Sequence, residues 1–153
     1  MVPKVLGLTE KSEARPILGF SDTETIKLDF DNASFRTVKY WAFRTMKHFR
    51  LDGFLILKSS QKSYHVVFNR VVSWAQNIRV VAWVALLSNS KGLQKFCLMQ
   101  CIKTSSTLRI SRKKEKPCPR IVCRIGEQDQ KIKDFLRIRR LIKRIGHKTR
   151  ENR

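Results

Sequence analysis

The chain has 153 residues, of which 42% are hydrophobic and 29% are charged. This length and composition support one domain with a real core, so they exclude two ordinary domains and wholesale disorder. Lys and Arg number 33 against 12 Asp and Glu, a net charge of +21, which makes nucleic acid the first partner to consider and an anionic membrane surface the second.

The first half of the chain predicts an arm, a strand, a helix and two further strands, over residues 1–17, 19–31, 34–50, 54–57 and 64–69. In the first strand Ile26, Leu28 and Phe30 alternate with polar residues, which indicates one buried and one polar face. The helix carries an apolar stripe at three- and four-residue steps, and Asn32 or Ser34 can cap its N-terminus.

The second half predicts two helices, two short strands and a final helix, over residues 72–87, 93–103, 107–111, 120–124 and 131–145. This order predicts a single α+β domain, with a mostly antiparallel or mixed sheet and helices packed on it. We place the core of the domain at residues 18–126, and a basic C-terminal helix and tail at 127–153.

Export and membrane insertion are not expected. Residues 1–10 lack a basic region followed by an apolar stretch, so they predict no signal peptide. The most apolar window, residues 71–87, is interrupted by Gln76, Asn77 and Arg79, and falls short of a spanning helix. We therefore predict an intracellular, cytoplasmic protein with no membrane partner.

Two carboxylates stand at the end of the first predicted strand. Asp29 and Asp31 are two residues apart, so they project from one face of the strand. Like charges at this spacing are unfavourable unless cations compensate them, and Mg²⁺ or Mn²⁺, which prefer oxygen ligands, would do so. Such ions also bind phosphates and promote phosphoryl or nucleotidyl transfer. The plainer alternative is a solvated strand end near several lysines.

A serine and a histidine open the strand predicted over residues 64–69. Ser63 and His65 share one face of that strand, and Lys58 and Lys62 flank the polar turn before it. A hydroxyl, an imidazole and nearby ammonium groups suit the phosphates of a nucleotide. The alternative is a histidine that is hydrogen-bonded within the fold and has no further role.

Together, and in this order, the two motifs resemble the archaeo-eukaryotic primase superfamily. Leu28-Asp29-Phe30-Asp31 resembles the family's first motif, and Ser63-Tyr64-His65 resembles its second, Ser-x-His. The resemblance covers about residues 18–125 and implies a primase-like catalytic core with an RRM-like fold. It also implies metal-dependent nucleotide polymerisation, with Asp29 and Asp31 as metal ligands and catalytic residues. Ser63 and the catalytic His65 would contact the incoming triphosphate.

The family's third motif, a further acidic residue on a later strand, has no clear counterpart. Residues 66–114 contain no Asp or Glu, and the corresponding strand presents Arg109 on its polar face. Arg109 suits a triphosphate or a template phosphate. Asp22 or Glu24 could supply the missing carboxylate; otherwise the site would bind nucleotide with weak catalysis or none.

Basic residues in two places are expected to hold nucleic acid. The turn Arg112-Lys113-Lys114, together with Lys62, lies near the predicted site and suits phosphates of the nucleotide or template. The C-terminal helix would present four further cations, namely Arg137, Arg140, Lys143 and Arg144. Nothing in the sequence encodes readout of bases, so binding should be salt-sensitive and directed at the backbone.

Zinc and disulfides are not expected. The cysteines are spaced Cys-x3-Cys and Cys-x4-Cys, whereas the usual zinc knuckle is Cys-x2-Cys, and thiols stay reduced inside the cell. These cysteines are Cys97, Cys101, Cys118 and Cys123. The tryptophans Trp41, Trp74 and Trp83 lie in predicted helices, so we assign them to the core rather than to base stacking.

The leading hypothesis is a primase-like nucleotidyltransferase domain of DNA replication, from a plasmid, a virus or an archaeal cell. Its partners would be nucleoside triphosphates, Mg²⁺ or Mn²⁺, and a DNA or RNA template. The alternative is a non-catalytic basic nucleic-acid-binding protein, either a degenerate member of the same fold or a protein of ribosomal type. Distances among Asp29, Asp31 and His65 discriminate the two, because clustering favours the catalytic lineage and scatter favours the binder.

Overall fold

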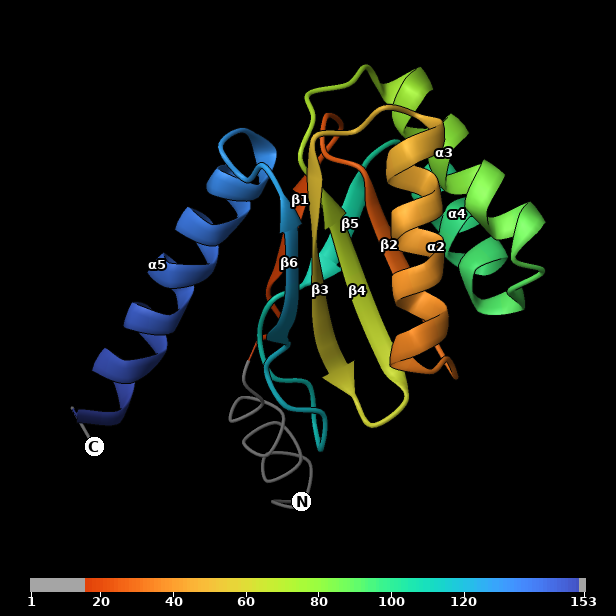
Figure 1. The fold of residues 1–153 in the computed structure, drawn as a ribbon. Coiled ribbons are helices and arrows are strands. Elements are labelled where there is room, and N and C mark those ends of the chain that lie inside the picture. The colour runs from red at the N-terminus through yellow and green to blue at the C-terminus, as the bar shows by residue number, and fades with distance from the viewer. Residues whose placement is uncertain (1–15, 152–153) are drawn as a thin grey trace.

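A computed structural model describes the backbone of residues 16–151 and the side chains of residues 16–145. The arm predicted over residues 1–17 lies almost wholly outside the described residues. Figure 1 shows the elements in chain order: β1 (Gly19–Asp22), β2 (Lys27–Phe30), α2 (Phe35–His48), β3 (Gly53–Ser60), β4 (Ser63–Phe68), α3 (Trp74–Leu87), α4 (Lys91–Lys103), β5 (Ser106–Arg109), β6 (Arg120–Gly126) and α5 (Lys131–Glu151).

The strands form two antiparallel sheets. One has four strands in the order β2-β4-β3-β6, and the other pairs β1 with β5. The predicted α+β class, with an antiparallel sheet and helices packed on it, is therefore confirmed. The single strand predicted over residues 19–31 is wrong, because a turn divides it into β1 and β2. Asp22 fixes that turn by accepting a hydrogen bond of 3.0 Å from the backbone N–H of Thr25.

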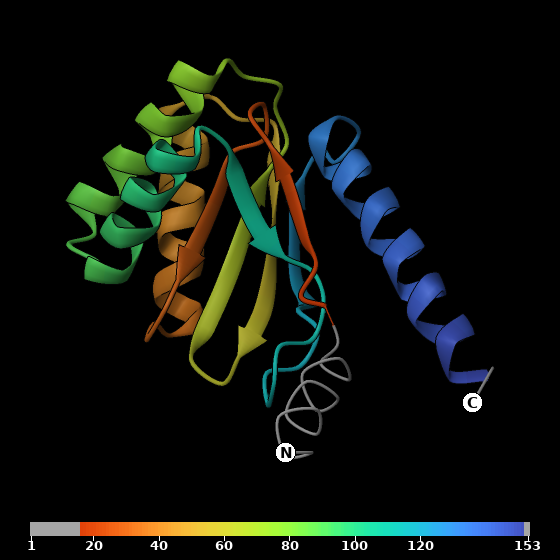
Figure 2. The same cartoon turned by 180° about the vertical axis from the view of Figure 1, so that it is seen from behind.

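The four-stranded sheet separates two hydrophobic clusters. On one face Leu28, Ile56 and Val66 pack with side chains of α2, α3 and α4. On the other face Leu57 packs with side chains of β1, β5 and α5, including Phe135. Figures 1 and 2 show α2 on one side of this sheet and the β1–β5 pair on the other, with α5 beyond the β6 edge. Burying each large apolar side chain stabilises the fold by about 1.5–3 kcal/mol.

Serines begin three of the described helices. Ser34, one of the two predicted caps, accepts a hydrogen bond from the backbone of Thr37 at the start of α2. Ser73 and Ser90 do the same for α3 and α4, which satisfies backbone donors that a helix leaves free at its N-terminus. None of the helices within residues 16–151 combines the length and apolarity needed to cross a bilayer.

Candidate functional site

Both sequence motifs meet at one end of the four-stranded sheet. The antiparallel pairing of β2 with β4 places Asp29 opposite His65, and Oδ1 of Asp29 is 3.6 Å from Nε2 of His65. Ser63, the first residue of β4, donates a hydrogen bond of 2.9 Å from Oγ to Oδ1 of Asp31. We call these four residues, Asp29, Asp31, Ser63 and His65, the Asp–Ser–His cluster.

The strand alternation explains why the four side chains share a face. Leu28 and Phe30 belong to the core on the helical side of the sheet, as do Tyr64 and Val66. Asp29 on β2, and Ser63 and His65 on β4, alternate with these core residues. They therefore project from the opposite face, toward the β1–β5 pair. A one-residue slip in the register of β2 on β4 would send the cluster into the core.

The two carboxylates differ in exposure. About a third of the Asp29 side chain, 32%, is exposed, whereas Asp31 is open to solvent. Burial and the neighbouring charge of Asp31 raise the pKa of Asp29 to about 6, although Lys116 and Arg109 act in the opposite direction. Asp29 thus holds its negative charge at a free-energy cost that a bound cation would relieve.

His65 is buried and neutral. Burial lowers the pKa of its imidazole to about 3, and the positive charges of Arg109 and Lys116 add to that effect. The contact between His65 and Asp29 is therefore not an ion pair at neutral pH. A neutral imidazole can donate one hydrogen bond through its single N–H group.

Arg109 lies beside the cluster, but its guanidinium is largely engaged. One terminal nitrogen donates to the backbone carbonyls of Ser111 and Pro117, and the other donates to the carbonyl of Ser59 at 2.9 Å. The terminal nitrogens of Arg109, predicted to bind a phosphate, are thus already hydrogen-bonded in this conformation. Arg109 instead ties the segment after β5 to the end of β3, and it contributes positive charge to the site.

The segment that Arg109 positions is a tight, basic turn. The backbones of Lys113 and Lys116 bond to each other in both directions, at 3.1 and 2.8 Å, and Lys114 has a positive φ of 51°. Arg112 and these three lysines are exposed. The charge of Lys116 acts on both Asp29 and His65, so this end of the sheet combines an acidic pair with a basic rim.

Lys62 belongs to the same end of the molecule. It is exposed in the turn between β3 and β4, and its carbonyl accepts a hydrogen bond of 3.0 Å from the backbone of Ala33. This bond joins the β3–β4 turn to the loop after β2, which carries Asp31. Lys62 therefore flanks the Asp–Ser–His cluster.

Of the alternatives for a third carboxylate, Asp22 and Glu24 are both engaged with other side chains. Asp22 accepts from Nζ of Lys27 at 2.8 Å, and Glu24 forms an ion pair of 2.6 Å with Lys131 at the start of α5. Among residues 16–145, no three His, Cys, Asp or Glu side chains group as the ligands of a metal ion would. The carboxylates of the cluster therefore stand as a pair.

Sequence reasoning missed the role of Lys27, which lies on the same face of β2 as Asp29. Its side chain is fully buried, and Nζ donates to Asp22 at 2.8 Å and to the carbonyl of Ser106 at 2.9 Å. Burial lowers the pKa of Lys27 to about 8, against the opposing effect of Asp22. The only signal in the sequence was a lysine on a polar strand face with an aspartate five residues before it.

The remaining predicted residues lie elsewhere. The four cations predicted on α5, Arg137, Arg140, Lys143 and Arg144, are all exposed, and α5 lies beyond β6, away from the Asp–Ser–His cluster (Figure 1). All four cysteines are free thiols. Cys97 and Cys101 lie one turn apart on α4, while Cys123 lies on β6.

No family model, curated protein or solved structure matches the chain.

Proposed function

We propose that the chain is a primase- or polymerase-like nucleotidyltransferase domain, which binds a nucleoside triphosphate and a divalent metal ion at the Asp–Ser–His cluster on a nucleic-acid template. One observation carries the proposal. The β2–β4 pairing joins Asp29 and Asp31 to Ser63 and His65, although the two motifs lie more than thirty residues apart. A protein that only needed positive charge to bind nucleic acid has no reason to assemble this group.

The carboxylate pair fits Mg²⁺ or Mn²⁺ as one part of a coordination shell. Proteins usually hold Mg²⁺ through one or two carboxylates plus the phosphates of the substrate, rather than in a complete protein cage. Asp29 and Asp31 would be those carboxylates, and the raised pKa of Asp29 supports a site that favours an added cation. The bound ion would offset the charge of the triphosphate and activate the attacking hydroxyl. We expect metal and triphosphate to bind together, and neither to bind tightly alone.

The other side chains have separate tasks in this proposal. Ser63 holds Asp31 through its hydroxyl, and neutral His65 can donate a hydrogen bond to a phosphate oxygen without competing with the metal for charge. Lys116 and Arg109 supply positive potential toward the triphosphate. The exposed Lys62 and the turn at residues 112–116 offer contacts for phosphates of the nucleotide or template.

A second candidate is a non-catalytic nucleic-acid binder with the same fold. One observation favours it: Arg109 stands on the strand where the resemblance implies a third carboxylate, and both Asp22 and Glu24 are bound elsewhere. Such a protein would keep the geometry of the cluster but would lack metal-dependent chemistry.

Titration calorimetry with a nucleoside triphosphate, with and without Mn²⁺, tests the proposal. We expect binding that requires Mn²⁺ and disappears in Asp29→Ala/Asp31→Ala. The matched control is Glu24→Ala/Asp134→Ala, which removes two carboxylates that pair with Lys131 far from the cluster. Primer extension should follow the same pattern. If the wild type binds DNA but no triphosphate under any metal condition, the second candidate is correct.

A further inference from the structure

The outer face of α2 carries positive charge that no acidic side chain among residues 16–145 neutralises through an ion pair. The helix contains Arg36, Lys39, Arg44 and Lys47, and residues 32–51 include no Asp or Glu. The ion pairs among residues 16–145 do not include any of these four cations. A helix face of this kind attracts an anionic partner.

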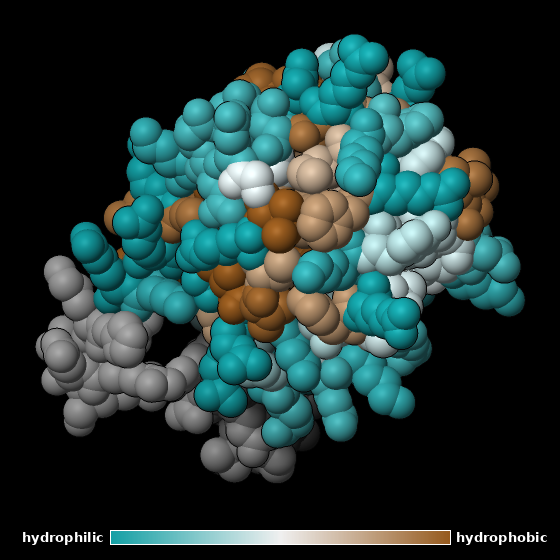
Figure 3. All heavy atoms as spheres, viewed as in Figure 1, coloured by the Kyte–Doolittle hydropathy of each residue, from teal (hydrophilic) through white to brown (hydrophobic). Residues whose placement is uncertain are grey.

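Aromatic rings are interleaved with these cations. Phe35, Tyr40 and Phe43 line a shallow groove of about 640 Å³ together with basic residues of the same helix. The side chains of Tyr40 and Phe35 are 56% and 36% exposed. Figure 3 shows apolar side chains gathered between β6 and α2, bordered by hydrophilic ones. Exposed rings beside cations suit a ligand that is both flat and anionic.

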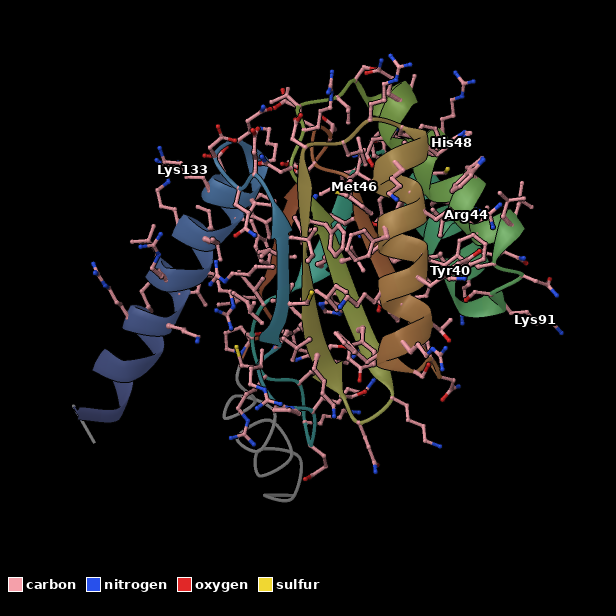
Figure 4. All side chains as sticks on the ribbon, in the orientation of Figure 1. Tyr40, Arg44, Met46, His48, Lys91 and Lys133 are labelled. Atoms are coloured by element: carbon pink, nitrogen blue, oxygen red, sulfur yellow. The ribbon has the colours of Figure 1, made fainter. Side chains whose placement is uncertain are left out.

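The rings are held in place before any ligand binds. Arg44 donates to the Tyr40 hydroxyl at 3.3 Å, and its guanidinium lies over Trp41 and Trp83, at 5.1 and 5.8 Å from the ring centres. The Tyr40 ring meets Trp41 edge-on at 5.3 Å, and His48 stacks on Trp83 at 4.5 Å. Figure 4 shows Tyr40, Arg44 and His48 along one side of α2. This order reduces the entropy lost on binding.

We propose that the outer face of α2 binds single-stranded nucleic acid, with bases stacking on Tyr40 and Phe35 and phosphates contacting Arg36, Lys39 and Lys47. Single strands expose the faces of their bases, and proteins that bind them combine basic grooves with stacking aromatic side chains. A duplex hides those faces, and an acidic peptide offers charge without flat rings.

This surface is distinct from the Asp–Ser–His cluster and does not rest on its proposed function. The two lie on opposite faces of the four-stranded sheet, but they approach each other at one end of it. Phe35 follows Asp31 by four residues, and its ring centre is 5.9 Å from that of Tyr64, which lies between Ser63 and His65 in β4. A single strand held on α2 would therefore run toward the end of the sheet that carries the cluster.

Fluorescence anisotropy with a labelled oligothymidylate of about 15 nucleotides tests the proposal. Tyr40→Ala should weaken binding roughly five- to 150-fold, the range found for loss of one base-stacking ring, whereas Tyr40→Phe should bind like the wild type. Arg36→Ala/Lys47→Ala should also lower the slope of log affinity against log salt by about 1.4, or about 0.7 for each lost phosphate contact.

Lys91→Ala/Lys95→Ala is the matched control, because it removes two exposed cations from α4. Figure 4 labels Lys91. Equal losses in both double variants would overturn the proposal in favour of a non-specific positive field. It would also be overturned if Tyr40→Ala bound normally, or if polyglutamate displaced the oligonucleotide as well as unlabelled oligothymidylate does. Asp29→Ala/Asp31→Ala should keep oligothymidylate binding whether or not the cluster binds triphosphate, so the two proposals fail separately.

Discussion

Two groups of polar side chains at opposite ends of β2 show opposite electrostatics. At one end of the strand, Lys27 and Asp22 form a contact of 2.8 Å, and hydrogen bonds from Lys27 and Thr25 hold the pKa of Asp22 below its ordinary value despite its burial. At the other end, the carboxylate of Asp29 accepts no hydrogen bond from any described residue, and burial and the charge of Asp31 raise its pKa.

The presence or absence of bonded partners distinguishes polar groups that stabilise the fold from polar groups placed to bind a ligand. A buried pair whose remaining donors and acceptors are bonded holds the fold together, and removing one partner leaves the other without compensation. A half-buried carboxylate with a like charge nearby costs stability, and it releases that cost when a cation arrives. By this comparison, Lys27 and Asp22 are structural, and Asp29 is the residue placed for a ligand.

The largest effect should follow from breaking the structural pair. We expect Lys27→Met to lower the free energy of unfolding by about 3–5 kcal/mol, because Asp22 and the carbonyl of Ser106 lose their buried donor. Urea denaturation at neutral pH measures it. Lys91→Met, on the exposed start of α4, should change stability by less than about 0.5 kcal/mol. Equal stabilities in the two variants would contradict the structural assignment.

Acid should destabilise the protein through His65. Its pKa is about 3 in the folded protein and 6.5 when unperturbed, so the unfolded chain binds a proton first as the pH falls. Stability is therefore lost progressively from pH 6.5 downward to pH 3. Denaturation at a series of pH values should show that loss in the wild type and a smaller one in His65→Gln. A pH dependence unchanged in His65→Gln would mean that the imidazole is not held neutral.

The sequence could predict the elements of the cluster because they depend on local patterns. Period-two alternation placed Asp29 and Asp31 on one face of a strand, and the same rule placed Ser63 with His65. The antiparallel pairing of β2 with β4, which skips β3 in the chain, does not follow from these local patterns. Local patterns also found α2 and its cap at Ser34.

Features that depend on distant segments were beyond the sequence. The burial of Lys27 requires β5 to lie over β2, and Ser106 is 79 residues away. The engagement of Arg109 depends on the carbonyl of Ser59, 50 residues away. Trp41 and Trp83, which the sequence assigned to the core, pack against it but are only half-buried between α2 and α3, because helical periodicity does not show which helix faces meet.

The smallest expected change in stability comes from a substitution of Asp29, the residue assigned to ligand binding. The folded pKa of Asp29, about 6, lies above its unperturbed value of 3.8, so the carboxyl stabilises the fold below pH 3.8 and that contribution is lost as the pH rises through 6. Asp29→Asn keeps a neutral side chain of the same shape. At pH 7.5 it should therefore raise the free energy of unfolding by about 1–2 kcal/mol, a figure discounted for partial exposure.

The same substitution should abolish Mn²⁺-dependent binding of triphosphate, since it removes the charge that attracts the ion. Asp134→Asn, on the exposed side of α5 with 47% of its side chain accessible, should change neither property. A variant at Asp29 that gains stability and loses the ligand would identify the residue as one whose charge serves binding at the expense of folding. Loss of stability in Asp29→Asn would instead place Asp29 with Lys27, as a group the fold needs.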